Sequence, residues 1–257
     1  ALSGMRPVLA IYSTFMQRAV DQVIHDIALP GLPVVIAMDR SGLVGEDGET
    51  HQGLYDIPLF RSVPGLSILA PATTGEMTHM LDWALAEDAP VMIRYPKGVC
   101  PEQKAGETLP IEGGRGVFVE ENGGDMLLVS VGGLYDEARR AVSLLAKDGV
   151  RADHYNLRFI KPLDEEHLEE LFSRYPHVLL VEDGAECGGV GEAIAAVVTR
   201  HGIDTSYRWY GVPDRFFPQA ERDELIRMFG LDAESIALNA KNQLAKPFSV
   251  VRPAVSQ

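Results

Sequence analysis

Cysteine, long uncharged apolar runs and positive charge are all scarce in this sequence of 257 residues. Its two cysteines, Cys100 and Cys187, form no C-x-x-C pair, so neither a disulfide framework nor a zinc site follows from them. No apolar run is long enough to predict a helix that spans a bilayer. A chain with so few cysteines is expected to work in a reducing cytoplasm.

The charge balance limits the partners that this chain can bind. Lys and Arg number 23 against 37 Asp and Glu, which leaves a formal net charge of −14. A field of this sign repels phosphate backbones and anionic lipids, so we expect neither nucleic acid nor a membrane surface as a partner. An anionic metabolite stays possible, because a few local arginines can outweigh a distant surface charge.

Apolar runs typical of buried strands alternate with stretches of helical periodicity. Residues 34–38, 66–70 and 91–93 are continuous apolar runs, as in strands that are buried on both faces. Apolar residues at helical spacing predict a helix from Ser13 or Thr14 to about Ile27 and another over 74–87. This alternation predicts an α/β fold with mainly parallel sheets flanked by helices.

The composition changes between residues 101 and 124, which are rich in Gly, Glu, Pro and Lys with one apolar interruption near 117–119. We interpret this segment as the link between two domains, residues 1–108 and residues 109–257, with the link counted in the second. The tail after Lys246 is expected to be extended or loosely held. The second domain is predicted to contain strands at 126–131, 152–157 and 178–181 and helices at 135–147, 164–175, 191–200 and 221–229, the last of the chain.

A long polar loop, residues 39–58, follows the apolar run at 34–38. Open α/β sheets bind their ligands at the carboxyl ends of strands, and ordinary connections there take about 2–6 residues. The loop contains four glycines, one Arg, one His and several carboxylates, a set suited to holding an anion and moving protons. A solvated surface loop with an incidental histidine is the alternative interpretation.

A second glycine-rich segment, Gly188-Gly189-Val190-Gly191, lies between a predicted strand and a predicted helix. It lacks both the Lys-Ser/Thr of a P-loop and a complete G-x-G-x-x-G. We therefore interpret it as a structural turn.

The segment Tyr12-Ser13-Thr14-Phe15-Met16-Gln17-Arg18-Ala19-Val20-Asp21-Gln22 resembles the Y-S-T-F-L-Q-R-A-Y-D-Q signature of the 1-deoxy-D-xylulose-5-phosphate synthase family. The resemblance continues in the same order over nearly the whole chain. Its further motifs are His25-Asp26, Asp39-Arg40, Asp47-Gly48, Thr50-His51-Gln52-Gly53, Arg94-Tyr95-Pro96-Lys97-Gly98, Phe159-Ile160-Lys161-Pro162-Leu163-Asp164, Val181-Glu182-Asp183-Gly184 and Gly211-Val212-Pro213-Asp214.

The resemblance implies a domain assignment. Residues 1–108 are similar to the family's pyrimidine-binding domain without its N-terminal part, and residues 109–257 to its transketolase C-terminal domain. Gly45-Glu46-Asp47-Gly48 only superficially resembles the G-D-G motif that holds magnesium in the family's first domain, because the next Asn is Asn122. The family's magnesium ligands and its cofactor-activating Glu, in an A-E-Q-H segment, are therefore expected outside this sequence. The chain alone is expected to be inactive.

The resemblance also implies an activity, that of a transferase which uses thiamine diphosphate and Mg²⁺. Enzymes of this family condense pyruvate with D-glyceraldehyde 3-phosphate, with loss of CO₂, to 1-deoxy-D-xylulose 5-phosphate. That product leads to isoprenoids, thiamine and pyridoxal. A homodimer is the expected assembly.

On the cofactor side, Phe15 matches the aromatic residue that stacks on the pyrimidine ring, and Tyr12 and Arg18 match further residues of the pocket. A core phenylalanine at the start of a helix is the alternative for Phe15. A salt bridge on the helix surface is the alternative for Arg18.

On the substrate side, His51 and Asp47 match catalytic residues, and Arg40 and Arg94 match the pair that grips the substrate phosphate. Tyr12 and Asp47 are expected to contact the substrate too. A solvated histidine, a turn aspartate and arginines that cap helices or pair with Asp39 are the alternatives. No metal ligand is assigned within the chain.

Lys97 stands where the family usually has Arg in R-Y-P-R-G, a departure of small expected effect.

Three other functions stay open. A transketolase or the separate β chain of a 2-oxoacid dehydrogenase would share the two-domain layout, and a β chain also lacks G-D-G. A non-catalytic binding module would have no use for Arg40, His51 and Arg94 together.

Overall fold

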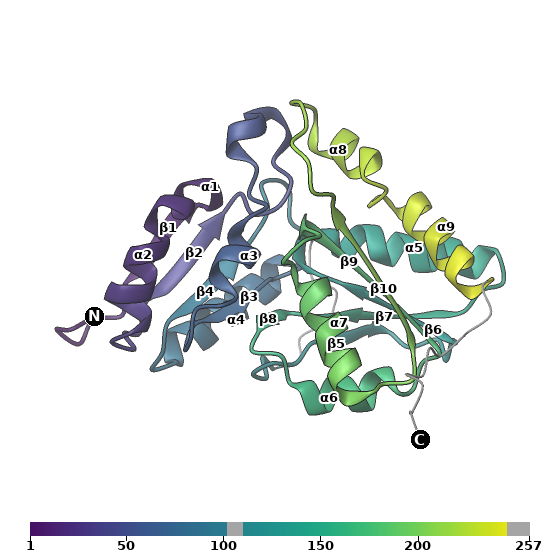
Figure 1. Cartoon of the computed structure of the whole chain (residues 1–257), viewed down its shortest axis with the longest axis horizontal. Coiled ribbons are helices and arrows are strands. Elements are labelled where there is room, and N and C mark those ends of the chain that lie inside the picture. Colours follow the sequence, from purple (N-terminus) through teal and green to yellow (C-terminus); the bar gives the residue numbers. More distant parts are fainter. Residues whose placement is uncertain (102–109, 246–257) are drawn as a thin grey trace, which may run out of the picture.

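The computed structural model describes residues 1–101 and 110–245, which form two five-stranded sheets flanked by helices (Figure 1). The first sheet has the strand order β1-β2-β4-β3-β8, and the second has the order β10-β9-β6-β7-β5. Most neighbouring strands are parallel, so the predicted α/β class is confirmed. Within the described residues, no helix has both the length and the apolar character needed to cross a membrane.

The parallel part of the first sheet comes from residues 1–101, which we call the first half of the chain; residues 110–245 are the second half. Its strands are β1 (Val8–Tyr12), β2 (Val35–Asp39), β3 (Ser67–Leu69) and β4 (Val91–Arg94). The helical elements of this half are α1 (Ser13–Met16), η1 (Gln17–Ala19), α2 (Val20–Gln22), η2 (Val23–Ala28), η3 (Gly45–Asp47), η4 (Glu49–His51), α3 (Asp56–Phe60) and α4 (Thr74–Ala86). The three predicted strands and two predicted helices are confirmed, although residues 13–28 mix α, 3-10 and π turns. Strand β1 was not predicted, although residues 8–11 form an apolar run, and in the structure it is a largely exposed edge strand.

The second half of the chain forms the second sheet. Its strands are β5 (Val117–Glu120), β6 (Met126–Ser130), β7 (Ala152–Asn156), β9 (His177–Ala185) and β10 (Ser206–Val212). Its helical elements are η5 (Gly132–Leu134), α5 (Tyr135–Lys147), α6 (Glu165–Phe172), α7 (Val190–His201), α8 (Arg222–Met228) and α9 (Ala233–Leu244). The strands and helices predicted here are confirmed.

Two expectations for the second half were wrong. The apolar interruption near 117–119 is not linker but β5, which pairs antiparallel with β7. The helix at 221–229 is not the last, because α9 follows it, begins at the capping residue Asp232 and packs on the core beside α5. The predicted linker residues 102–109 and the tail after residue 245 lie outside the described part of the chain.

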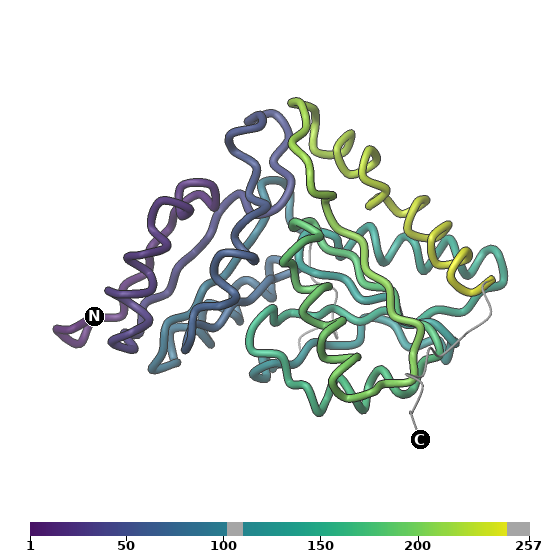
Figure 2. Tube along the Cα trace, viewed as in Figure 1, coloured from purple at the N-terminus to yellow at the C-terminus, as the bar shows by residue number. Residues whose placement is uncertain are grey.

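The two halves interlock at β8 (Phe159–Lys161). This strand belongs to the second half by sequence but pairs antiparallel with β3 as the last strand of the first sheet. The largest apolar core accordingly draws on both halves, from Met38 and Ile68 to Leu127 and Leu180. The two sheets therefore lie side by side as one body (Figure 2).

Buried ion pairs join the two halves at two further points. Arg94 at the end of β4 pairs with Asp183 of β9, and Arg158, just before β8, pairs with Glu76 of α4. These side chains are nearly inaccessible to water, where removal of one partner leaves an uncompensated buried charge. The position of one sheet against the other is therefore strongly constrained.

The glycine-rich segment at the start of α7 wraps around a buried carboxylate. The backbone N–H groups of Val190 and Gly191 donate to the side chain of Glu182, at 3.0 and 2.8 Å. The backbone amides of this glycine-rich segment are thus bonded within the protein, which supports its interpretation as a structural turn. Burial raises the pKa of Glu182 to about 7, although these N–H groups and Arg94 act in the opposite direction.

Glu182 is expected to make stability fall as the pH rises. Its pKa is higher in the folded chain than in the unfolded one, so the folded state binds more protons between the two values. The free energy of unfolding of the wild type should drop by about 3 kcal/mol, relative to Glu182→Gln, between pH 4.5 and 7.5. Urea unfolding at both pH values measures this. Glu170→Gln on an exposed face is the control and should follow the wild type, and parallel curves for the wild type and Glu182→Gln would contradict the assignment.

Candidate functional site

Six side chains meet where β1, β2 and β4 end, and we call them the strand-end cluster. Tyr12 closes β1, Phe15 lies in the following turn of helix, and Arg40 directly follows β2. Ligands of open α/β sheets bind at this edge, beyond the carboxyl ends of the strands. The remaining members are Asp47, His51 and Lys97.

Stacked aromatic rings form one half of the cluster. The rings of Tyr12 and Phe15 lie 5.4 Å apart and nearly parallel, at 6°, and His51 meets the edge of Phe15 at 5.7 Å. The guanidinium of Arg40 lies over the Tyr12 ring, 3.8 Å from its centroid. Phe15 is 42% exposed, so the alternative of a core phenylalanine does not apply. Its ring is available to a flat ligand.

Charged groups form the other half of the cluster. One carboxylate oxygen of Asp47 accepts from Arg40 Nε at 3.2 Å, and the other accepts from Lys97 Nζ at 3.1 Å. Arg40 also pairs with the neighbouring Asp39. Burial would raise the pKa of Asp47, but the hydrogen bonds and positive charges of Lys97 and Arg40 outweigh it and lower that pKa. Asp47 is therefore ionised at neutral pH and holds two cations close together.

The loop itself orients His51. Its Nδ1 and the hydroxyl of Thr50 are joined by a hydrogen bond of 2.9 Å. The hydroxyl of Thr14 in turn donates to the carbonyl oxygen of Thr50 at 2.8 Å, which ties the loop to the helix that carries Phe15. With Nδ1 engaged, Nε2 is the ring nitrogen that can exchange a proton with a ligand.

Two predicted site residues do not join the cluster. Arg18 is exposed and forms no ion pair within the described residues. It therefore does not form the surface salt bridge that was the alternative interpretation. Arg94 is only 3% exposed and pairs with Asp56 at 2.7 Å and Asp183 at 3.2 Å. Burial would lower the pKa of Arg94, but the two carboxylates raise it. The predicted phosphate contact of Arg94 therefore has no geometric support in this structure.

Lys97, and not Arg94, is the second cation beside Arg40 in the strand-end cluster. Arg94 ends a strand whose residues are all buried, whereas Lys97 lies three residues further on, in the loop that faces Asp47. The signal was present in the sequence, because a residue inside a doubly buried strand cannot reach solvent while one beyond its end can. Only the contact with Asp47 identifies Lys97 as part of the site.

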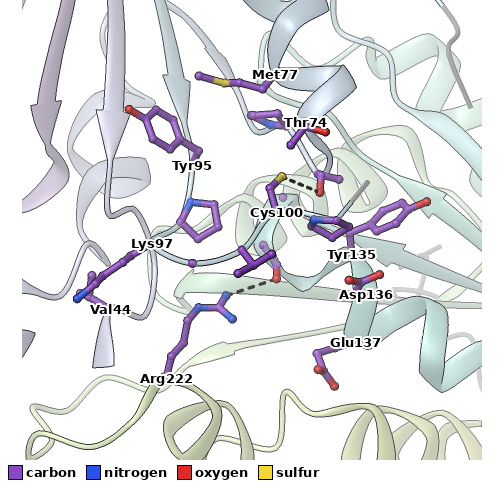
Figure 3. Close-up of a pocket in the computed structure, with 18 of the residues that line it drawn as sticks. Val44, Thr74, Met77, Tyr95, Lys97, Cys100, Tyr135, Asp136, Glu137 and Arg222 are labelled. Atoms are coloured by element: carbon purple, nitrogen blue, oxygen red, sulfur yellow. Dashed lines mark hydrogen bonds between the residues drawn. The ribbon is translucent and has the colours of Figure 1, made fainter. Parts of the chain in front are cut away.

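A cavity of about 810 Å³ adjoins the cluster between the two sheets. Tyr95 and Lys97 border it from the first half, and Tyr135 and Arg222 from the second (Figure 3). Within the described residues, no group of three or more His, Cys, Asp or Glu side chains could hold a metal ion. The side chains of the strand-end cluster are of kinds that can stack on an aromatic ring, bind an anion and transfer a proton.

Two protein-family models match the chain, "Transketolase, pyrimidine binding domain" over residues 1–103 and "Transketolase, C-terminal domain" over residues 114–236. A 1-deoxy-D-xylulose-5-phosphate synthase from Treponema pallidum is 46% identical over 254 residues, which cover 98% of this chain and 40% of the relative. The enzyme of the same name from Thermomicrobium roseum is 42% identical over 260 residues, 100% of this chain and 41% of the relative. The chain thus spans about two-fifths of the length of these relatives.

Solved structures share the fold. A structure described as "Split gene transketolase, inactive beta4 tetramer" superposes with a TM-score of 0.83 at 26% identity, covering 95% of this chain and 78% of that one. A transketolase from Pichia stipitis superposes with a TM-score of 0.73 at 22% identity, covering 93% of this chain and 34% of that one. The second likeness concerns the fold alone.

Proposed function

The chain belongs to the transketolase family and, within it, to the 1-deoxy-D-xylulose-5-phosphate synthases. We propose that it contributes part of the active site of such a synthase. The reaction condenses pyruvate with D-glyceraldehyde 3-phosphate and releases CO₂, in the cytoplasm. The observation that carries this proposal is the strand-end cluster, in which an exposed stacked ring, a histidine and two cations meet at one edge of the sheet.

The aromatic half of the cluster fits the pyrimidine ring of thiamine diphosphate. Phe15 presents an exposed ring backed by Tyr12, and a planar heteroaromatic ring gains from stacking on such a surface. When bound, thiamine diphosphate supplies the electron sink that allows pyruvate to lose CO₂. Mg²⁺ would bind with the diphosphate through residues outside the described part of this chain.

The charged half of the cluster fits the phosphate of the acceptor. Arg40 and Lys97 are held together by Asp47, and a guanidinium with an ammonium suits a phosphate dianion. Asp47, ionised, is placed to accept a hydrogen bond from a substrate hydroxyl. In this proposal His51 gives a proton to the carbonyl oxygen of the aldehyde as the new carbon–carbon bond forms.

We also propose that the working enzyme is a homodimer that needs further polypeptide besides these residues. Large apolar side chains are exposed around β1 and the helical stretch that follows it, where a partner surface would cover them. They are Leu2, Met5, Val8, Leu9, Ile24 and Leu29. The split transketolase structure, described as an inactive tetramer, supports the expectation that this chain alone is inactive.

The test of the proposed function is the release of CO₂ from pyruvate by the complete protein with thiamine diphosphate and Mg²⁺. We expect release that D-glyceraldehyde 3-phosphate stimulates, with 1-deoxy-D-xylulose 5-phosphate as the product. Transfer of a two-carbon unit from a ketose phosphate, without CO₂, would instead indicate a transketolase. Failure of both reactions would reject the proposal.

Truncation of the stacked ring of Phe15 should selectively weaken binding of the cofactor. Phe15→Ala is expected to raise the half-saturating concentration of thiamine diphosphate about 3- to 10-fold, since aromatic stacking contributes roughly 0.5–1.5 kcal/mol. Titration of activity, or of intrinsic fluorescence, with the cofactor measures it. Phe216→Ala removes another exposed phenylalanine, one outside the cluster, and should leave this value unchanged. Equal effects of the two variants would contradict the role of Phe15.

A further inference from the structure

The loop that carries Asp47 and His51, residues 39–58, is embedded in the second half of the chain. Leu43 and Leu54 are buried and belong to the apolar core of the second sheet, with Phe217 and Leu225. Figure 2 shows the tip of the loop beside the segment that leads into α8. We call residues 39–58 the site loop. Leu43 and Leu54 are thus anchored outside the domain that contains the rest of the strand-end cluster.

Two glycines allow the site loop to approach the second half closely. A β-carbon on Gly42 would overlap the carboxylate of Asp183, and one on Gly45 would lie 2.6 Å from the backbone nitrogen of Arg222. Both glycines have positive φ, +77° and +71°, where other residues are strained. No larger residue fits at either position without separating the loop from the second half.

Hydrogen bonds hold the same interface. The side-chain N–H of Gln219 donates to the carbonyl oxygen of Glu46 at 2.6 Å, one residue before Asp47. The backbone N–H of Ala185 donates to the carbonyl oxygen of Leu54 at 3.3 Å, three residues after His51. The contacts therefore lie on both sides of the reactive pair.

The site loop thus has two sides with different partners. Its two leucines, Gly42 and Gly45 face the second half. Asp47 pairs with Lys97 and His51 meets Phe15, and both of these partners lie in the first half outside the loop. We propose that the second half, through Gln219 and the backbone at Arg222, positions Asp47 and His51 for the reaction. This inference rests on the proposed function and deepens it, because it gives the transketolase C-terminal domain a part in acceptor binding.

The test compares Gly45→Ala with Gly65→Ala in the complete protein. Gly65 has a similar φ of +73° but no heavy atom within 4 Å of an added β-carbon, so it reproduces the backbone strain without the overlap. Gly45→Ala should lower kcat about 100-fold and raise KM for D-glyceraldehyde 3-phosphate, because small displacements of reacting groups have effects of that order. Gly65→Ala should keep both values at the wild-type level.

Gln219 supplies a second and milder test at an exposed position. Gln219→Ala should reduce kcat/KM for the aldehyde about 3- to 10-fold, the range for one hydrogen bond. Gln219→Glu has the same size but no N–H donor and should behave like Gln219→Ala. A wild-type level in Gln219→Glu together with a loss in Gln219→Ala would show that volume, not the hydrogen bond, matters, and would overturn the assignment of Gln219.

Hydrogen exchange separates this inference from the proposed function. Exchange of the backbone amides of residues 43–56, followed by mass spectrometry, should become faster in Gly45→Ala and Gln219→Ala and not in Gly65→Ala. Unchanged exchange would overturn the anchoring, and faster exchange with unchanged kcat and KM would overturn the positioning role. If the wild type lacks synthase activity, the proposed function fails while the exchange measurement still decides whether the second half holds the loop.

Discussion

Replacement of Arg94 by alanine is expected to lower the free energy of unfolding by roughly 3–5 kcal/mol, the range for breaking a buried ion pair. Arg94 is the only cation within the described residues that contacts both Asp56 and Asp183, and all three are nearly inaccessible to water. Its removal would leave two buried carboxylates without this partner, and Arg222, which also contacts Asp183 at 3.4 Å, replaces it only in part. A loss of this size is a large fraction of the total stability of a typical domain.

Urea unfolding of the wild type and of Arg94→Ala measures the loss. Arg140→Ala is the matched control, because Arg140 pairs with Glu137 at 2.8 Å on an exposed face. Surface pairs of this kind contribute about 1 kcal/mol or less. An unchanged stability of Arg94→Ala, together with a higher KM for D-glyceraldehyde 3-phosphate, would restore the role as a phosphate ligand that the family resemblance implies.

Removal of Arg40 or Lys97, the two partly exposed cations of the strand-end cluster, should strongly weaken binding of the acceptor. Each of Arg40→Ala and Lys97→Ala is expected to raise KM for D-glyceraldehyde 3-phosphate about 10- to 100-fold, because a hydrogen bond to a charged group contributes roughly 1.5–3 kcal/mol. The double variant should lose more than either single one. Stability should change little, because both side chains are partly exposed and Asp47 can be solvated.

Initial rates at varied aldehyde concentration measure this effect. Two controls test whether it is specific to these cations and to the phosphate. Lys147→Ala removes an exposed cation outside the cluster and should leave KM unchanged. D-Glyceraldehyde without phosphate, used as the acceptor, should react equally slowly with the wild type and with the variants. A variant that loses affinity for both acceptors equally would show that Arg40 and Lys97 do not bind the phosphate.

Much of the fold was predictable because its signals are local. The strands at 34–38 and 126–131 are apolar except for Ser130, and both are buried in the structure. Helix α5 combines apolar residues at helical spacing with acidic residues in its first turn, so its bounds followed from the sequence. Strand β10 was missed because Ser206 and Arg208 interrupt its apolar pattern at the edge of the sheet. Strand β1 is an apolar run that was not predicted, and it lies largely exposed at the edge of the other sheet.

The candidate site was predictable in its membership more than in its geometry. The family resemblance pointed to Tyr12, Phe15, Arg40, Asp47 and His51, which the structure brings together. It also pointed to Arg94, which the structure buries, and it treated Lys97 as a minor departure. Two cations three residues apart look equivalent in a motif. Their environments differ because one ends a buried strand and the other lies beyond it.

The sequence by itself determined the α/β class, the order of most strands and helices, the family and the chemistry of the strand-end cluster. All of these depend on periodicity or on short motifs, which involve residues close together in the chain. Only the tertiary structure decided that β8 completes the first sheet and that the second half holds the site loop. Such contacts join residues more than 80 positions apart, and the packing of the whole chain selects them, since no local pattern records which distant surface a strand or a loop will meet.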